Sequence, residues 1–259
     1  APAPILGFRL GGYKSGNMAV DPPDDCRNVP DDMKAFARFM QDFVQDSPFP
    51  IYNQYKHTGV WRNVTIRTAK KTQQRLVTVM VSLAEVLPGR AADWAAERAR
   101  LAAAVRGPGC PVALTAFCLQ VYNGLSAPNP DEGVEEVFGG TTIVEELLGL
   151  TFEISPTSFF QTNTEATEVL YSKVADLCID GELATVSTGN KNGRVRIFDV
   201  CCGTGTIGLC VAKRLTGRDV EIIGVDLVPS AIEDARRNAR RNGFLTAAAA
   251  GAGPDGGGG

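Results

Sequence analysis

A glycine-rich turn is the part of this sequence with the clearest capacity for chemistry. Residues 203–208 read Gly-Thr-Gly-Thr-Ile-Gly, which matches the pattern G-x-G-x-x-G. The turn follows a short apolar stretch at 195–200 and opens an apolar helical stretch that runs to about Leu215. Glycines here let a ligand approach the backbone closely, and a helix N-terminus offers free N–H groups with a positive dipole. The pattern therefore predicts a nucleotide-type ligand site, with a tight turn that binds nothing as the alternative.

Two aspartates bear on which ligand this turn would hold. Asp226 stands at the end of a second apolar stretch, 220–225, where a carboxylate can accept hydrogen bonds from both ribose hydroxyls of an adenosine. Asp199 stands at the end of the first stretch, where it would repel a pyrophosphate but suit the cationic methionine end of S-adenosylmethionine. The two acids favour the methyl donor over a dinucleotide. An NAD-dependent oxidoreductase remains the alternative enzyme.

The elements around the turn predict a parallel α/β unit. Thr162 with Glu165, and Ser230 with Glu233, have the spacing of capping boxes that open helices. The two apolar stretches are short, as buried strands are. Strand, helix, strand and helix joined by short turns predict a parallel, right-handed arrangement. A doubly wound sheet needs more than two strands, so residues 146–246 are expected to form an incomplete Rossmann-like domain with exposed sheet edges and marginal stability.

The first 145 residues read as an α+β domain with mostly antiparallel strands. Apolar residues recur at helical spacing in two segments, and Val, Ile and Thr are enriched in several others. We expect helices at 31–46 and 91–105, and strands at 60–68, 76–83, 112–121, 141–148 and 150–154. The overall fold class is α/β, with domains at 1–145 and 146–246. A polar loop at 180–194 and a disordered Ala- and Gly-rich tail at 247–259 complete the organisation.

Composition sets further bounds on the class of protein. The 259 residues are 44% hydrophobic, enough for a packed core in one large domain or two smaller ones. No apolar run reaches the roughly 18–20 residues that a membrane helix needs. The seven cysteines are an odd count without a regular framework, which favours reduced thiols inside a cell. Ligand spacing such as C-x-x-C is lacking, so no metal site is predicted. The cytoplasm or nucleus is expected rather than the mitochondrion. The opening Ala-Pro-Ala-Pro, without Met, has the look of a cut fragment.

Charge is distributed in blocks along the chain. The 26 Lys and Arg residues against 29 Asp and Glu residues give a net charge of −3, which excludes a protein that is basic overall. Residues 51–84 nevertheless contain basic side chains and no acid, whereas residues 107–172 contain nine acids and no Lys or Arg. The nearly neutral total therefore hides one basic and one acidic segment.

Several stretches resemble a known family. Residues 155–164 read Ser-Pro-Thr-Ser-Phe-Phe-Gln-Thr-Asn-Thr, which is similar to the SP-x-SFFQ-x-N signature of the RNA (uracil-5-)-methyltransferases. The stretch at 199–209 resembles their cofactor loop. Further similarity lies at 7–9 and 59–64, which resemble the family's central domain, and at 224–226 and 231–239, which resemble its ribose-binding strand and the helix after it. The resemblance spans roughly residues 5–245 and is closest to the eukaryotic tRNA (uracil-5-)-methyltransferase branch.

The resemblance implies a central domain that binds RNA, here tRNA, followed by a Rossmann-like class I methyltransferase domain that binds S-adenosylmethionine. By their places in the motifs, the residues implied to bind the cofactor are Gln161, Cys201, Gly203, Gly205, Thr206 and Asp226. Phe159 and Phe160 would shape the same pocket. No membrane partner is expected, and the oligomeric state stays open. A non-catalytic RNA-binding remnant is the third interpretation.

The chemistry implied by the resemblance forms 5-methyluridine. A Cys thiolate adds to carbon 6 of uracil, carbon 5 then attacks the sulfonium methyl group, and a base removes the carbon-5 proton before the thiol leaves. The family's nucleophile follows a D-P-P-R-x-G motif, and its base is a Glu near the C-terminus, but this sequence contains neither motif. Cys201 and Cys202 lie in the cofactor loop and are not assigned as the nucleophile. No catalytic residue is therefore predicted, and the chain alone is expected not to complete a turnover.

The resemblance also suggests a role for the basic segment. Residues 56–75, interleaved with Tyr55 and Trp61, could contact RNA phosphates and stack on bases. A solvated hairpin face is the alternative. If the segment binds RNA, charge reversal at Lys70 and Lys71 should weaken tRNA binding.

Overall fold

The computed structural model describes residues 6–11, 17–84, 86, 89–129, 132–180 and 195–245 of the chain. The chain divides into two compact units, one formed by Ala1–Thr68 and Arg75–Thr141, the other by Ala69–Gln74 and Thr142–Gly259. The segment Ala69–Gln74 connects two strands of the first unit but is grouped with the second. The predicted tail at 247–259, and all but the first residue of the predicted loop at 180–194, lie outside the described residues.

The first unit is built on a mixed four-stranded sheet with the order β3-β4-β5-β6. Strands β3 and β4 pair antiparallel, as the predicted hairpin requires, but β4 and β5 are parallel. This parallel pair is compatible with the expectation of mostly antiparallel strands, and it arises because helix α2 lies between the two strands and returns the chain to the same end of the sheet. The elements are β1 (Phe8–Arg9), β2 (Val20–Asp21), η2 (Pro23–Asp25), α1 (Asp31–Gln45), β3 (Trp61–Thr68), β4 (Arg75–Val81), α2 (Ala91–Arg106), β5 (Ala116–Val121) and β6 (Val134–Phe138).

Strand β6 has no counterpart in the sequence prediction. It pairs antiparallel with β5 at one end of the sheet order. Two of its five residues, Glu135 and Glu136, are exposed acids. Charged side chains are common on edge strands, where they oppose unwanted pairing, but they break the apolar alternation by which strands are predicted.

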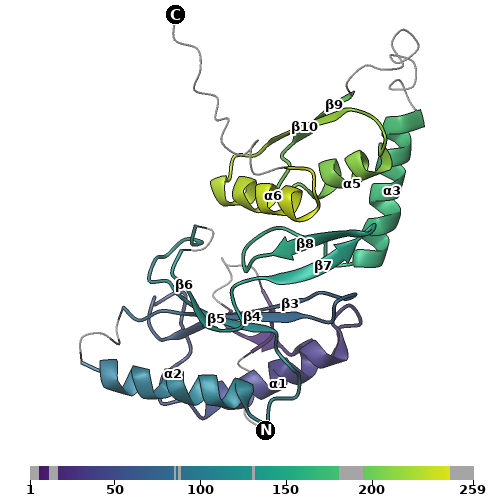
Figure 1. Ribbon diagram of the computed structural model, residues 1–259. Helices are drawn as coiled ribbons and strands as arrows, with labels where there is room; N and C mark the ends of the chain where they lie inside the picture. The colour runs from purple at the N-terminus through teal and green to yellow at the C-terminus, as the bar shows by residue number, and fades with distance from the viewer. Residues whose placement is uncertain are drawn as a thin grey trace, which may run out of the picture. The chain divides into compact units, whose positions relative to one another are not determined.

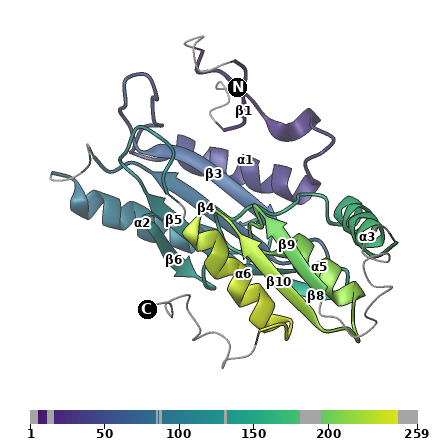
Figure 2. The ribbon, with the colours of Figure 1, turned by 90° about the horizontal axis from the view of Figure 1, so that it is seen from above.

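Both long helices of the first unit cover the same face of this sheet, as the two ribbon views show (Figures 1 and 2). Helix α1 contributes Phe36 and Met40 to a buried core, and α2 contributes Leu101. They pack with Val79 of β4 and Phe117 of β5 in the same cluster. The apolar residues whose helical spacing predicts the two helices thus lie on the faces that pack into the core.

Trp61 belongs to this core and is only 6% exposed. Its ring lies 5.9 Å from that of Phe43 and 5.7 Å from that of Trp94, measured between ring centroids. The indole N–H donates to the hydroxyl of Ser47 at 3.0 Å, which satisfies its one polar group. The expectation that Trp61 stacks on RNA bases is therefore wrong, because the ring is enclosed by protein.

Within its described residues, the second unit contains two small sheets and three helices. Its hairpin β7–β8 is antiparallel, as predicted, and β9 and β10 pair in parallel over all six residues. Helices α5 and α6 lie between the hairpin and the β9–β10 pair (Figure 1). The elements are β7 (Ile143–Leu147), β8 (Leu150–Ile154), α3 (Thr164–Asp180), β9 (Val195–Val200), α5 (Thr206–Arg214), β10 (Val220–Val225) and α6 (Pro229–Arg241).

Strands β9 and β10 are less buried than their apolar sequences predict. Phe198 is 66% exposed, Val200 73% and Val225 55%. The alternating residue Ile197 instead packs with Val211 and Leu215 of α5 and the loop after it. The helices thus cover one face of the pair, and within the described residues nothing covers the other. The expectation of two fully buried strands is therefore wrong.

The predicted capping boxes are also wrong in detail. Helix α3 is capped by Asn163, whose Oδ1 accepts a hydrogen bond from the N–H of Ala166 at 3.0 Å. Helix α6 begins at Pro229 with no side-chain cap, because proline suits the first turn and has no N–H to satisfy. Glu165 lies in the first turn of α3 but bonds a lysine instead of the backbone.

The position of Trp61 gives a stability prediction. Trp61→Ala should lower the free energy of unfolding by about 3–5 kcal/mol, because it removes a large side chain from a packed core. Phe8→Ala is the matched control, since Phe8 is 55% exposed in the same unit and should change stability by less than about 0.5 kcal/mol. Urea unfolding of both variants tests this. Equal losses would show that Trp61 is not in the core.

Candidate cofactor-binding site

The glycine-rich turn lies between β9 and α5, where the motif predicts it. Gly203 and Gly205 have φ angles of +54° and +79°, in the left-handed region that glycine adopts without strain. The N–H of Gly205 donates to the carbonyl of Cys202 at 2.8 Å, which tightens the turn. A Cβ on Gly203 would meet open space, whereas one on Gly205 would lie 3.2 Å from the Cβ of Ala235. The turn therefore packs against α6 at Gly205 and leaves room for a ligand at Gly203.

Cys201 also has a left-handed backbone, with φ of +61°, although it is not glycine. Its side chain is exposed, whereas that of Cys202 is buried. The N–H of Cys202 donates to the carbonyl of Val225 at 3.0 Å and ties the turn to the end of β10. A non-glycine residue held in this conformation carries a small strain that the surrounding contacts must offset.

The last glycine of the motif has the packing role that the motif predicts. A Cβ on Gly208 would lie 2.8 Å from Oδ2 of Asp199 and 3.2 Å from a methyl carbon of Ile222. The bare backbone lets the N–H of Gly208 donate to the same oxygen of Asp199 at 2.9 Å. Helix α5 can therefore approach both strands closely only with glycine at this position.

Asp226 braces the turn from the end of β10. Its Oδ2 accepts a hydrogen bond from the N–H of Gly203 at 2.8 Å, and its Oδ1 accepts one from the N–H of Val228 at 2.9 Å. These bonds, first that from Val228 and then that from Gly203, hold the pKa of Asp226 below its ordinary value. Each carboxylate oxygen retains acceptor capacity, so the group could also accept from hydroxyls of a ligand.

Asp199 has the opposite electrostatic character. Burial raises the pKa of its carboxyl, and the like charge of Asp226 raises it further, while the hydrogen bond from Gly208 opposes both. Two carboxylates thus lie at the carboxyl ends of neighbouring parallel strands. A positively charged ligand group near them would favour the ionised form of Asp199.

The signature segment at 155–164 is anchored at its start by buried contacts. The hydroxyl of Ser155 donates to Oδ2 of Asp234 on α6 at 3.0 Å, and the ring of Phe160 lies 6.2 Å from that of Phe152 on β8. Phe159 is 72% exposed, so it lines no packed core. Gln161 is half-buried, and within the described residues no hydrogen bond joins it to the glycine turn. Its contact with a cofactor stays a prediction.

Asn238 on α6 is a site residue that the sequence analysis missed. Its side chain is fully buried, its Oδ1 accepts from the N–H of Glu153 at 2.8 Å, and its Nδ2 donates to the carbonyl of Thr204 at 3.1 Å. One amide thus connects β8 with the glycine turn. Asn242, the residue that follows α6, bonds both the N–H and the carbonyl of Thr151 on β8. The spacing of four residues between the two asparagines is the signal that places both on the same side of α6.

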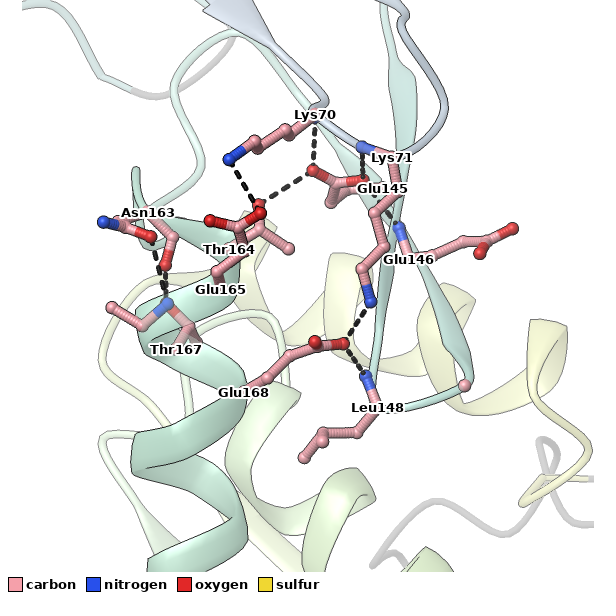
Figure 3. A network of polar contacts seen from close by, with 12 residues as sticks. Lys70, Lys71, Glu145, Glu146, Leu148, Asn163, Thr164, Glu165, Thr167 and Glu168 are labelled. Atoms are coloured by element: carbon pink, nitrogen blue, oxygen red, sulfur yellow. Dashed lines mark hydrogen bonds and ion pairs between the residues drawn. The ribbon is translucent and has the colours of Figure 1, made fainter.

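A second network joins the segment Ala69–Gln74 to β7 and α3 (Figure 3). Lys70 forms an ion pair with Glu165 at 2.9 Å, and Lys71 forms one with Glu168. The bond from Lys71, followed by one from the N–H of Leu148, lowers the pKa of Glu168. The expectation that Lys70 and Lys71 contact RNA phosphates therefore gains no support, because both ammonium groups are bound to acids of the same unit.

Two other basic residues of the segment 56–75, Arg62 and Arg75, serve the fold of the first unit. Arg62 donates to the carbonyls of Tyr122 and Gly124 at 2.7 and 2.9 Å. Arg75 donates to Oδ2 of Asp32 at 2.7 Å. The basic block is thus largely a set of structural contacts, and charge counts along the sequence could not distinguish these from contacts with a partner.

Three of the seven cysteines, Cys118, Cys202 and Cys210, are buried, whereas Cys201 is exposed. All seven cysteines are unpaired. Burial raises the pKa of Cys118 to about 11 and that of Cys210 to about 12, which keeps both protonated and unreactive.

The part of the chain that the structure describes contains no group of three or more His, Cys, Asp and Glu residues arranged to hold a metal ion. It also contains no helix with the length and apolarity to cross a membrane.

Comparison with known proteins shows what the second unit is similar to. Residues 191–249 match the family model described as a methyltransferase domain. A solved structure, the tRNA (uracil-54, C5)-methyltransferase of Pyrococcus abyssi in complex with S-adenosyl-L-homocysteine, aligns with a TM-score of 0.57 at 24% identity. The alignment covers 81% of this chain and 44% of that chain, and it supports the α/β fold.

Curated relatives confirm the family resemblance that the motifs indicate. The human tRNA (uracil-5-)-methyltransferase homolog A is 38% identical over 240 residues, which cover 92% of this chain and 35% of the relative. The zebrafish (Danio rerio) tRNA (uracil-5-)-methyltransferase homolog B is 33% identical, with 92% of this chain and 46% of the relative covered. The chain thus resembles the RNA (uracil-5-)-methyltransferase family along nearly its whole length, while it spans less than half of these relatives.

The raised pKa of Asp199 predicts how stability varies with pH. A folded-state pKa above the usual value means that the wild type loses stability as the pH rises from about 4 through that pKa. Asp199→Asn has no proton to lose, and its amide oxygen can still accept from Gly208. The melting temperature of this variant, relative to wild type, should therefore rise through this pH window and then level off.

Thermal unfolding between about pH 4 and pH 7 provides the measurement. Asp219→Asn is the control, because it removes one carboxylate from an exposed position of the same unit. A difference between Asp199→Asn and wild type that does not change with pH would contradict the assignment.

Proposed function

We propose that this chain forms the S-adenosylmethionine-binding and RNA-binding part of a tRNA (uracil-5-)-methyltransferase. The observation that carries the proposal is the turn at 203–208, braced by Asp226 and open toward solvent at Gly203. The names of the human and zebrafish relatives, and the bound S-adenosyl-L-homocysteine of the archaeal structure, support the same activity and cofactor.

The residues of the turn suit S-adenosylmethionine, which would supply an electrophilic methyl group when bound. Asp226 would accept hydrogen bonds from the ribose hydroxyls, and the open backbone at Gly203 would let the ligand approach the N-terminus of α5 at Thr206. Gly205 would support this site by keeping the turn tight against α6. Asp199 would attract the cationic end of the cofactor. Gln161 and Cys201 complete the proposed contacts, and the acceptor would be carbon 5 of a uridine in tRNA.

A cavity supports RNA binding by the first unit. It has a volume of about 790 Å³, and its charged residues are Arg9 and Arg62, with no acid in its described lining. Phe8, Tyr52 and Gln54 also line it. Most of the remaining lining is apolar. The basic, aromatic and amide side chains among it are of the kinds that bind phosphates and bases of single-stranded RNA.

Titration calorimetry with S-adenosyl-L-homocysteine tests the cofactor site. Asp226→Ala should weaken binding at least about tenfold, because it removes charged acceptors from the ribose hydroxyls and loosens the turn at Gly203. Glu233→Ala is the matched control, since it removes an exposed carboxylate from α6 in the same unit, and it should leave the affinity unchanged.

Two results would contradict the proposed cofactor. One is equal affinity of wild type and Asp226→Ala for S-adenosyl-L-homocysteine. The other is binding of NAD by a wild-type chain that does not bind S-adenosyl-L-homocysteine, which would favour the oxidoreductase alternative.

The RNA-binding proposal predicts a change in salt dependence. Arg9→Ala should weaken binding of unmodified tRNA and reduce the slope of log affinity against log salt by about 0.7–0.9, the contribution of one phosphate contact. Arg27→Ala is the control, because Arg27 is an exposed arginine of the same unit outside the cavity lining. Filter binding at several salt concentrations measures both. Identical slopes for the two variants would argue against RNA in this cavity.

A further inference from the structure

A buried carboxylate lies at the centre of the network in Figure 3. Glu145 on β7 is only 1% exposed. Its Oε1 accepts from the N–H groups of Lys71 and Glu146 at 3.0 and 2.9 Å, and its Oε2 accepts from the N–H of Lys70 at 2.5 Å. The fourth donor is the hydroxyl of Thr164, at 2.8 Å from Oε2. Four donors around one buried group suit the ionised carboxylate.

These bonds connect elements far apart in the chain. Lys70 and Lys71 come from Ala69–Gln74, whereas Thr164 is the first residue of α3. The same segment is further bound to β7 at Val144, whose N–H donates to Oε1 of Gln74 at 2.8 Å and whose carbonyl accepts from the hydroxyl of Thr72. The segment Ala69–Gln74 and β7 are thus held together by several hydrogen bonds, and Glu145 connects the start of α3 to both.

The start of α3 is also the end of the signature segment. That segment is held at Ser155 by Asp234 and at Thr164 by Glu145, and all four side chains are at most 6% exposed. Gln161 lies between the two anchors, three residues before Thr164. Fixing both ends of the segment restricts the conformations open to it, and the anchors therefore restrict where Gln161 can lie.

Helix α3 also contacts the first residues of α5, next to the glycine turn. Tyr171, 4% exposed on α3, places its hydroxyl 3.4 Å from that of Thr206, the first residue of α5. Tyr171 also packs in one cluster with Leu209 and Cys210 of α5. A displacement at Thr164 would therefore change the position of α3 relative to the turn.

We propose that Glu145 is a positioning residue, whose carboxylate fixes the start of α3 and thereby holds Gln161 in the orientation that binds the cofactor. The inference rests on the proposed function, because it requires Gln161 to contact the cofactor. Glu145 touches no ligand in this proposal and acts through Thr164.

A double-mutant cycle on the full chain tests the proposal. Glu145→Gln keeps the shape of the side chain, but its amide NH₂ would face backbone N–H donors. It should weaken S-adenosyl-L-homocysteine binding about tenfold, an interaction of ordinary size for a coupled pair. Gln161→Ala should weaken binding by itself, and Glu145→Gln should add little in the Gln161→Ala background. A residue that supports only the overall fold would weaken binding equally in both backgrounds.

Glu146→Gln is the matched control, because Glu146 is the exposed neighbour on the same strand. It should leave affinity unchanged. Thermal unfolding of every variant reports folding separately from binding. If Glu145→Gln does not fold, Thr164→Val replaces it in the cycle, since that variant removes only the hydroxyl bonded to Glu145.

The outcomes separate the two proposals. A wild-type chain that does not bind S-adenosyl-L-homocysteine, or that binds it equally with Gln161→Ala, removes the basis for the cofactor contact and the positioning role together. Binding that is weakened by Gln161→Ala but not by Glu145→Gln overturns the positioning role alone. Additive losses in the double variant do the same.

Discussion

A buried polar group must find a hydrogen-bond partner, and this constraint determines how the second unit holds its loops. Asn238 is fully buried and joins β8 to the glycine turn through Glu153 and Thr204. If the amide were lost, an N–H and a carbonyl would be left unpaired, each at a cost of about 1–3 kcal/mol. The turn is therefore held by a specific polar contact rather than by apolar packing alone.

The same constraint acts at both ends of the signature segment. Ser155 pairs with Asp234, and Thr164 pairs with Glu145. Apolar packing tolerates small sliding movements, whereas a buried hydrogen bond fixes distance and direction. Placing polar pairs at the ends of irregular segments therefore gives the second unit a defined site although its strands are only partly covered.

Local patterns predicted the elements of this fold well, whereas contacts between distant elements could not be predicted. The periodicity at 31–46 and the apolar stretch at 195–200 depend on neighbouring residues alone, and both elements form as expected. The role of Gly208 could also be predicted, because the strand–turn–helix context is local. The partners of Lys70 and Lys71 depend on which chain segment folds back onto them, so the sequence showed a basic block and an acidic block without showing that they pair.

The two aspartates of the site illustrate what geometry adds to the motif. Sequence position places Asp199 and Asp226 at the ends of adjacent strands, but it does not show how the pKa of either acid is shifted. In the structure, backbone N–H groups lower the pKa of Asp226, whereas burial and the neighbouring charge raise that of Asp199. Asp226 is therefore a stable anion that can bind hydroxyls, and Asp199 is the group whose ionisation a cation would favour.

This difference bears on ligand choice at the turn. A dinucleotide would bring the negative pyrophosphate to a site where two carboxylates already repel each other, which would further disfavour ionisation of Asp199. A sulfonium or ammonium group would relieve that repulsion and could bind the same acid directly. Because the glycine turn itself accommodates either ligand, the electrostatics of the two acids, rather than the turn, favour the cationic cofactor.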